Sequence, residues 1–223
     1  MKKISFLSIV LFIGVVLAGA FYEYVSCALS IALAGYLFYL YKKNGKLKIN
    51  KNISFIAVCS IVLFYGISAL WAVDWGMALI GFFKFMPLIL YALVLMQDQT
   101  DSEKILGVMP FAMVIITVIT AILMQIEPLK DYFAVAGRLA GTFQYPNTYA
   151  IVLLVCELFV IQKEERKKID YALIALLLAG ILLTGSRTVF VITALSNVAT
   201  FLLSKNKKQK QIDNNSTYAS YFT

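Results

Sequence analysis

Long apolar runs alternate with short polar segments along nearly the whole chain of 223 residues. Their lengths come close to the ~20 apolar residues that a helix needs to cross the hydrocarbon core of a bilayer. The pattern therefore predicts an all-α fold, a polytopic transmembrane helix bundle within residues 1–203. Residues 204–223 are polar and are expected to form a disordered tail. About eight spans are expected, at residues 4–21, 24–41, 53–71, 77–96, 105–126, 146–162, 171–184 and 188–203.

The first run admits two interpretations. Ala18, Gly19 and Ala20 resemble the small-residue cleavage site of a secretory signal peptide. A second apolar run follows almost at once, which favours an uncleaved first helix. The order of the later spans is the same in both cases.

Composition agrees with a membrane protein and excludes several other classes. The chain is 61% hydrophobic and 14% charged, against roughly 25% charged residues in soluble domains, and its mean hydropathy is +0.83. The net charge is +8, but the basic residues lie in short clusters between apolar runs, which is typical of cytoplasmic loops and not of a nucleic-acid-binding surface. The chain has no histidine, and its three cysteines lie inside apolar runs, so no metal site and no disulfide framework is indicated.

Lysine and arginine are distributed unevenly between the two sides of the expected bundle. If the N-terminus is cytoplasmic, eight spans return the C-terminus to the same side, and sixteen of the twenty basic residues then lie inside. The four others are Lys84, Lys130, Arg138 and Arg187. Because basic residues accumulate in cytoplasmic loops, we expect both termini to be cytoplasmic.

Arginine is rare in this chain and lies where the charge bias disfavours it. Of three arginines, against seventeen lysines, two fall on the outer side. A guanidinium presents a planar, permanently charged fork that suits phosphate or carboxylate. Proline suits a first helical turn and serine an N-cap, so two helices are expected to direct N-terminal N–H groups outward. The predicted anion site contains Arg138 and Arg187, with Gly141, Thr142, Pro146, Asn147 and Ser186 beside them.

Simpler interpretations of these charges stay open. Arg138 could be a solvated loop residue, and Arg187 could pair with Asp74 or Asp131 at the outer interface. Lys84, inside the fourth run, could extend outward to the interface or add charge to the anion site. Glu157, inside the sixth run, is either a functional intramembrane acid or a neutral, hydrogen-bonded carboxyl between helices.

The two arginine-bearing segments resemble the O-antigen ligase/polymerase family of bacterial membrane glycosyltransferases. The matching stretches are residues 138–147 (RLAGTFQYPN) ahead of an apolar run, residues 182–187 (LLTGSR) and, more weakly, residues 69–74 (ALWAVD). The resemblance implies inverting transfer of a saccharide from a polyprenyl-diphosphate-linked donor, on the outer face of the bacterial cytoplasmic membrane, during surface polysaccharide biosynthesis. It also implies that Arg138 and Arg187 bind the diphosphate and stabilise it as a leaving group, without a cofactor.

The chain departs from this family in one respect that matters for catalysis. Family members carry a large outward loop with a histidine proposed to activate the acceptor, and this chain has no histidine. We therefore expect the N-terminal part of a longer enzyme, able to hold the donor. The glycan, the acceptor and the oligomeric state are not indicated. Two other functions stay open: a small transporter or channel that uses Glu157 and Lys84, and a non-catalytic accessory membrane protein.

Overall fold

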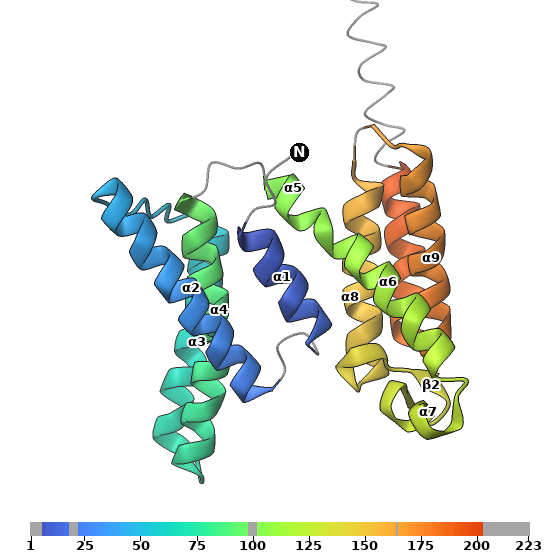
Figure 1. Ribbon diagram of the computed structural model, residues 1–223, viewed down its shortest axis with the longest axis horizontal. Helices are drawn as coiled ribbons and strands as arrows, with labels where there is room; N and C mark the ends of the chain where they lie inside the picture. Colours follow the sequence, from blue (N-terminus) through green and yellow to red (C-terminus); the bar gives the residue numbers. More distant parts are fainter. Residues whose placement is uncertain (1–5, 18–21, 98–101, 164, 203–223) are drawn as a thin grey trace, which may run out of the picture. The chain divides into compact units, whose positions relative to one another are not determined.

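Helices follow the apolar runs throughout the part of the chain that the computed structural model describes, residues 6–17, 22–97, 102–163 and 165–202 (Figure 1). The chain divides into two compact units, Met1–Ala112 and Met113–Thr223, and the division falls within helix α6 (Val108–Leu123). The candidate cleavage site at 18–20 and the predicted tail at 204–223 lie outside the described residues.

The first unit is built on one central helix, α4 (Trp75–Gln97), which packs against both α2 (Glu23–Asn44) and α3 (Ile53–Ser68). The remaining elements are α1 (Phe6–Val16), the short 3-10 helix η2 (Ala69–Trp71) and α5 (Ser102–Leu106). A cluster of buried apolar side chains joins α1, α2, α4 and α5: Leu7, Val10, Leu33, Val94 and Ile105.

Local signals in the sequence set the ends of these helices. The Asn52 side chain accepts a hydrogen bond of 2.8 Å from the Phe55 N–H and so caps α3. The Asp74 carboxylate accepts one of 3.0 Å from the Met77 N–H at the start of α4. Helix α2 ends at Gly45, whose φ of 69° is in the left-handed region that glycine adopts without a steric penalty.

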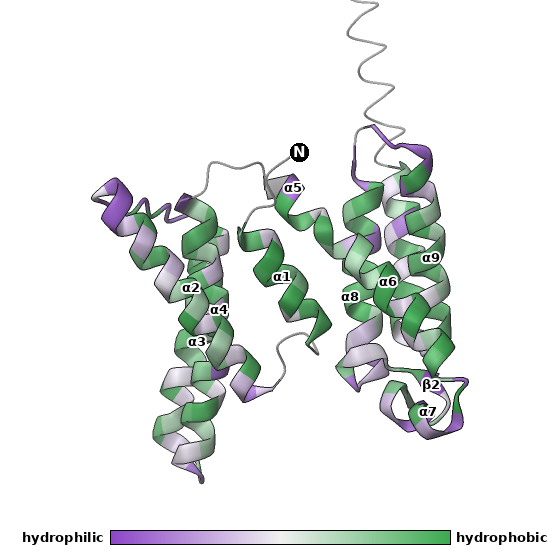
Figure 2. Cartoon of the chain, viewed as in Figure 1, coloured by the Kyte–Doolittle hydropathy of each residue, from purple (hydrophilic) through white to green (hydrophobic). Residues whose placement is uncertain are grey.

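The second unit consists of α8 (Pro146–Ile161), α9 (Lys168–Thr184), the helix Arg187–Leu202 and the second part of α6. Apolar residues cover these helices along their length, and polar residues gather at their ends (Figure 2). Three helices approach closely around Gly180: a Cβ there would lie 2.9 Å from Cγ2 of Thr117 and 3.0 Å from Cδ1 of Leu153. The fully buried Tyr149 of α8 shares a hydrogen bond of 2.7 Å with the Thr117 hydroxyl of α6.

The connection between α6 and α8 is more ordered than the sequence indicated. It contains α7 (Glu127–Phe133), a hairpin of β1 (Ala134–Val135) and β2 (Arg138–Leu139), and the 3-10 helix η3 (Gly141–Phe143). The two residues of the hairpin turn, Ala136 and Gly137, have φ values of 51° and 75°. Two successive positive φ values identify a type I′ turn, whose twist matches that of a two-stranded hairpin.

An ion pair ties the end of α8 to the start of α9. Nζ of Lys163 lies 2.7 Å from a carboxylate oxygen of Asp170, and the Lys167 N–H donates to the other oxygen at 2.8 Å. These two donors hold the pKa of Asp170 below its usual value, the Lys163 hydrogen bond having the larger effect. The α8–α9 connection is therefore fixed by a deprotonated carboxylate.

The all-α fold is confirmed, whereas the number of spans stays partly a prediction. Each apolar run contains a helix within the described residues. Four helical segments are long and apolar enough to cross a membrane: Glu23–Asn44, Ile53–Trp71, Trp75–Gln97 and Lys104–Leu123. The helices α1, α8 and Arg187–Leu202 are apolar but shorter.

Replacing Gly141 with alanine should destabilise the second unit. The φ of Gly141 is 58°, and a Cβ would lie 2.6 Å from the Tyr149 ring, so the substitution combines backbone strain with a clash against a buried aromatic residue. We expect a cost of roughly 2–4 kcal/mol, measured by thermal unfolding in detergent. Gly137→Ala is the matched control, because Gly137 has a φ of 75° with no atom within 4 Å, and about 1 kcal/mol is expected for it. Equal losses would show that the Tyr149 contact is unimportant.

Stability should fall in acid in a manner that depends on Asp170. Because its pKa is lowered in the folded state, the carboxylate stabilises the fold at pH values above about 3.9, the pKa of an unfolded aspartate, and this stabilisation is lost as the pH falls through the lower folded value. Asp170→Asn should lower the unfolding temperature at pH 7 and remove this part of the acid dependence. The exposed Asp131 provides a control, Asp131→Asn. An unchanged acid profile in Asp170→Asn would contradict the assignment.

Candidate functional site

Arg138 lies on β2, directly after the hairpin turn, and its half-buried side chain reaches two helix ends. Its Nε–H donates to the carbonyl oxygen of Thr184 at 2.7 Å, and an Nη2–H donates to the side-chain oxygen of Asn147 at 2.8 Å. Thr184 is the last residue of α9, and Asn147 is the second residue of α8. Arg138 therefore joins the C-terminal end of α9 to the N-terminal end of α8, the helix that precedes it in the chain.

The two arginine-bearing segments are in direct contact. Gly185 follows Thr184 with a φ of 60°, and a Cβ built on it would lie 3.3 Å from Nε of Arg138. Glycine is thus favoured at this position both by the backbone conformation and by the space that the guanidinium occupies. Arg187, two residues later, begins the last helix and is exposed.

The guanidinium of Arg138 keeps hydrogen-bonding capacity after these contacts. Arginine has five N–H donors, and two are used in the bonds to Thr184 and Asn147. No salt bridge joins Arg187 to Asp131 among the described residues. Both cations can therefore act on an anion. The described part of the chain contains no group of three or more acidic or cysteine side chains that could hold a metal ion.

Two helices begin at this end of the second unit, as the sequence predicted. Pro146 is at the start of α8, and the last helix begins after Ser186. Ser186 is buried; its carbonyl accepts from the Phe190 N–H at 2.9 Å, and its own N–H donates to the Thr184 hydroxyl at 3.3 Å. The predicted cap by the Ser186 side chain is not among the hydrogen bonds of the described residues.

Gly141 and Thr142 connect the hairpin to α8. Gly141 packs against the Tyr149 ring, so its lack of a side chain serves internal packing. The hydroxyl oxygen of Thr142 is buried and has no hydrogen-bond partner in the described structure. A buried polar group without a partner costs about 1–3 kcal/mol, and a bound ligand can relieve that cost. Participation of these residues in anion binding stays a prediction.

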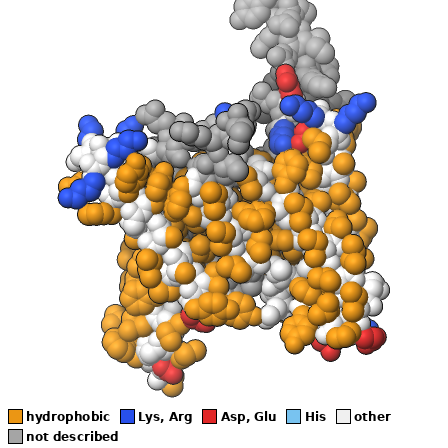
Figure 3. Space-filling view, viewed as in Figure 1, with side chains coloured by type: hydrophobic (Ala, Val, Ile, Leu, Met, Phe, Trp, Pro, Cys, Tyr) orange, Lys and Arg blue, Asp and Glu red, His pale blue; other side chains and the backbone are white. Residues whose placement is uncertain are grey.

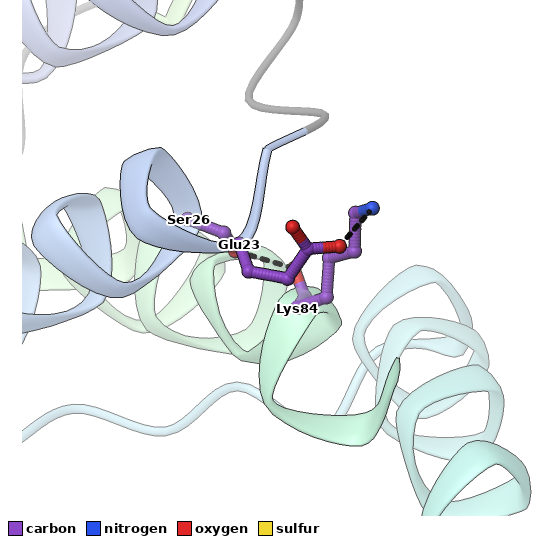
Figure 4. Close-up of polar contacts among 3 residues, drawn as sticks. All are labelled: Glu23, Ser26 and Lys84. Atoms are coloured by element: carbon purple, nitrogen blue, oxygen red, sulfur yellow. Dashed lines mark hydrogen bonds and ion pairs between the residues drawn. The ribbon is translucent and has the colours of Figure 1, made fainter. Parts of the chain in front are cut away.

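Two contacts of Lys84 lie within the first unit. Its Nζ lies 3.1 Å from a carboxylate oxygen of Glu23, and the Ser26 hydroxyl donates to the Lys84 carbonyl at 2.7 Å (Figure 4). Pro87 lies three residues further along α4, and a proline disturbs the carbonyls of the preceding turn. The Ser26 hydroxyl therefore supplies a hydrogen-bond donor to a carbonyl in the turn that precedes the proline. A contribution of Lys84 to the arginine site stays a prediction.

Glu157 is fully buried four residues before the end of α8. One of its carboxyl oxygens accepts a hydrogen bond of 2.8 Å from the side-chain amide of Asn197 on the last helix. The other carboxyl oxygen and the amide oxygen of Asn197 are both buried without a partner in the described structure. Both are acceptors when the carboxyl group is ionised, and a proton on the carboxyl group turns one of them into a donor. The geometry thus favours a neutral glutamic acid that links two helices. Asn197 was not identified from the sequence.

Comparison of the chain with protein-family models, with curated proteins and with solved structures finds no match. The resemblance noted in the sequence therefore has no independent support, and the function rests on the residues and geometry of the arginine end.

Substitutions at Glu157 distinguish a neutral carboxyl from a charged one. Glu157→Gln keeps the shape and an oxygen acceptor, so we expect a change below about 1 kcal/mol in unfolding free energy. Glu157→Ala removes the hydrogen bond and leaves a cavity, and should cost roughly 2–4 kcal/mol. Both are measured by unfolding in detergent at pH 7. If the glutamine variant lost as much as the alanine variant, the negative charge itself would be required, which would favour the transporter or channel alternative.

Proposed function

We propose that the protein binds the diphosphate of a polyprenyl-linked saccharide at Arg138 and Arg187 and takes part in transfer of that saccharide, as O-antigen ligase/polymerase-like glycosyltransferases do. The observation that carries the proposal is the position of Arg138. Its guanidinium is fixed by Thr184 and Asn147, keeps unused N–H donors, and lies against the segment that leads to Arg187.

A diphosphate is the anion that fits this arrangement best. When the bond between sugar and diphosphate breaks, negative charge develops on the leaving oxygen, and fixed cationic donors stabilise that charge. Two arginines offer paired N–H groups that match phosphate oxygens. The N-termini of α8 and the last helix add unpaired backbone N–H groups at the same end of the unit.

The charge distribution along α8 and α9 supports an outward orientation of this end. The opposite end of the pair carries the basic connection with Lys163, Arg166, Lys167 and Lys168. The positive-inside rule places that connection in the cytoplasm. The arginine site then faces the outer side of a bacterial plasma membrane, where lipid-linked glycans are joined in this class of enzyme.

The proposal assigns donor binding and leaving-group stabilisation to this chain. Activation of the acceptor hydroxyl needs a general base, and the chain contains no histidine for that role. The Thr142 hydroxyl, buried without a partner, is a candidate donor to a phosphate oxygen.

Arg187 offers the clearest test, because its side chain is exposed and its replacement should leave the fold intact. In purified membranes, Arg187→Ala should weaken binding of a fluorescent polyprenyl-diphosphate saccharide roughly tenfold to a hundredfold, the value of a charge-assisted hydrogen bond. Arg187→Lys should recover part of the affinity, because lysine keeps the charge but not the bidentate geometry.

The third arginine of the chain provides the matched control. Arg166 is exposed and lies in the α8–α9 connection, and Arg166→Ala removes the same charge from the other end of the unit. The affinity of the Arg166→Ala variant for the donor should stay within about threefold of that of the unmodified protein, since exposed charges beyond a Debye length are largely screened. Similar losses in Arg166→Ala and Arg187→Ala, or no loss in either, would contradict the proposal.

A further inference from the structure

We propose that a basic cavity at the end of α2 and α4 binds the phosphate headgroup of an anionic phospholipid. The cavity belongs to the first unit, and the inference is independent of the proposed glycan chemistry. Its volume is about 480 Å³, within the range of small-molecule sites in proteins. Lysine side chains gather at this end of α2 (Figure 3).

Three of the described residues that line the cavity are lysines, and none of the lining residues that the structure describes is acidic. Lys43 is in the last turn of α2, and Lys46 and Lys48 are in the segment that follows Gly45. Among the described residues no salt bridge neutralises these three ammonium groups. Their mutual repulsion is relieved by an anion in the cavity. The neighbouring Lys42 makes a cation–π contact instead, with its Nζ 5.5 Å from the centre of the Phe38 ring.

The cavity is held in shape by Gln97, the last residue of α4. Its side-chain oxygen accepts from the Lys48 N–H at 2.7 Å, and its side-chain nitrogen donates to the Lys48 carbonyl at 2.6 Å and to the Leu93 carbonyl at 3.0 Å. Both backbone groups of Lys48 are thus fixed to the end of α4. The backbone on one side of the cavity is therefore fixed before a ligand binds, which reduces the entropy lost on binding.

The composition of the cavity wall favours a lipid over a soluble phosphate. Tyr36 and Leu40, one to two turns back along α2, form an apolar side of the cavity. Helices α2 and α4 are both long and apolar enough to span a membrane, so their common end lies at the level of the headgroups. An anionic phospholipid presents a phosphate beside an apolar glycerol-linked chain. Free phosphate would leave the apolar side unused, whereas basic pockets at helix ends are known to suit anionic headgroups.

The test compares lipid retention by two double variants of the full chain that carry the same change of charge. Lys46→Gln/Lys48→Gln alters the cavity, and Lys42→Gln/Lys51→Gln alters lysines that do not line it. Each protein is purified from vesicles of phosphatidylglycerol or phosphatidylcholine, and bound lipid is counted by native mass spectrometry. Because the Gln97 bonds involve only the backbone of Lys48, the cavity variant should fold normally, which thermal unfolding checks.

The unmodified protein should retain phosphatidylglycerol in preference to phosphatidylcholine. The cavity variant should lose at least tenfold in affinity for phosphatidylglycerol, at roughly fivefold per lysine, and the control variant less than about threefold. Gln97→Leu, which changes no charge but releases Lys48, should also weaken retention.

Equal losses in the two double variants, or equal retention of the two lipids, would overturn the proposal. Displacement of the lipid by millimolar inorganic phosphate would identify a soluble anion as the ligand and would overturn it as well.

Discussion

The hydrogen bonds of one guanidinium group organise the polar end of the second unit. Arg138 binds the last carbonyl of α9 and the side chain of Asn147 in the first turn of α8. A cation at the C-terminal end of a helix is favoured by the helix dipole, and the same contact fixes the direction of the remaining N–H groups. The stability of the helix junction and the geometry of the candidate binding site thus depend on one residue, so that a loss of Arg138 affects both.

The helices and several of their ends could be predicted from the sequence, because both depend on local patterns. Apolar runs of sufficient length identify helices, and Pro146 and Ser186 mark the starts of two of them. The contact between the two arginine-bearing segments was also anticipated in outline. What the sequence could not supply was the identity of the partners, since Arg138 binds Thr184 through a main-chain oxygen that any residue would provide.

Features that depend on distant residues or on unusual turn chemistry were missed. The hairpin turn uses Ala136 with a positive φ, where asparagine or glycine is the usual signal, so no hairpin was expected. Glu157 meets Asn197 across 40 positions, and Lys84 meets Glu23 across 61. Each of these polar side chains finds its partner on another helix. The buried Glu157–Asn197 pair specifies that its two helices lie together, because an unpaired polar group in an apolar surrounding is costly.

The sequence separation of the Arg138 contacts has a consequence for the biosynthesis of the chain. Asn147 follows Arg138 by nine residues, but Thr184 follows it by 46. During synthesis from the N-terminus, the hairpin and the start of α8 are complete while α9 has not yet been translated. Arg138 can then bond only to Asn147, and its bond to Thr184 forms after the end of α9 has been synthesised. The junction around Arg138 is therefore assembled in two steps, and the second step requires that α9 has formed.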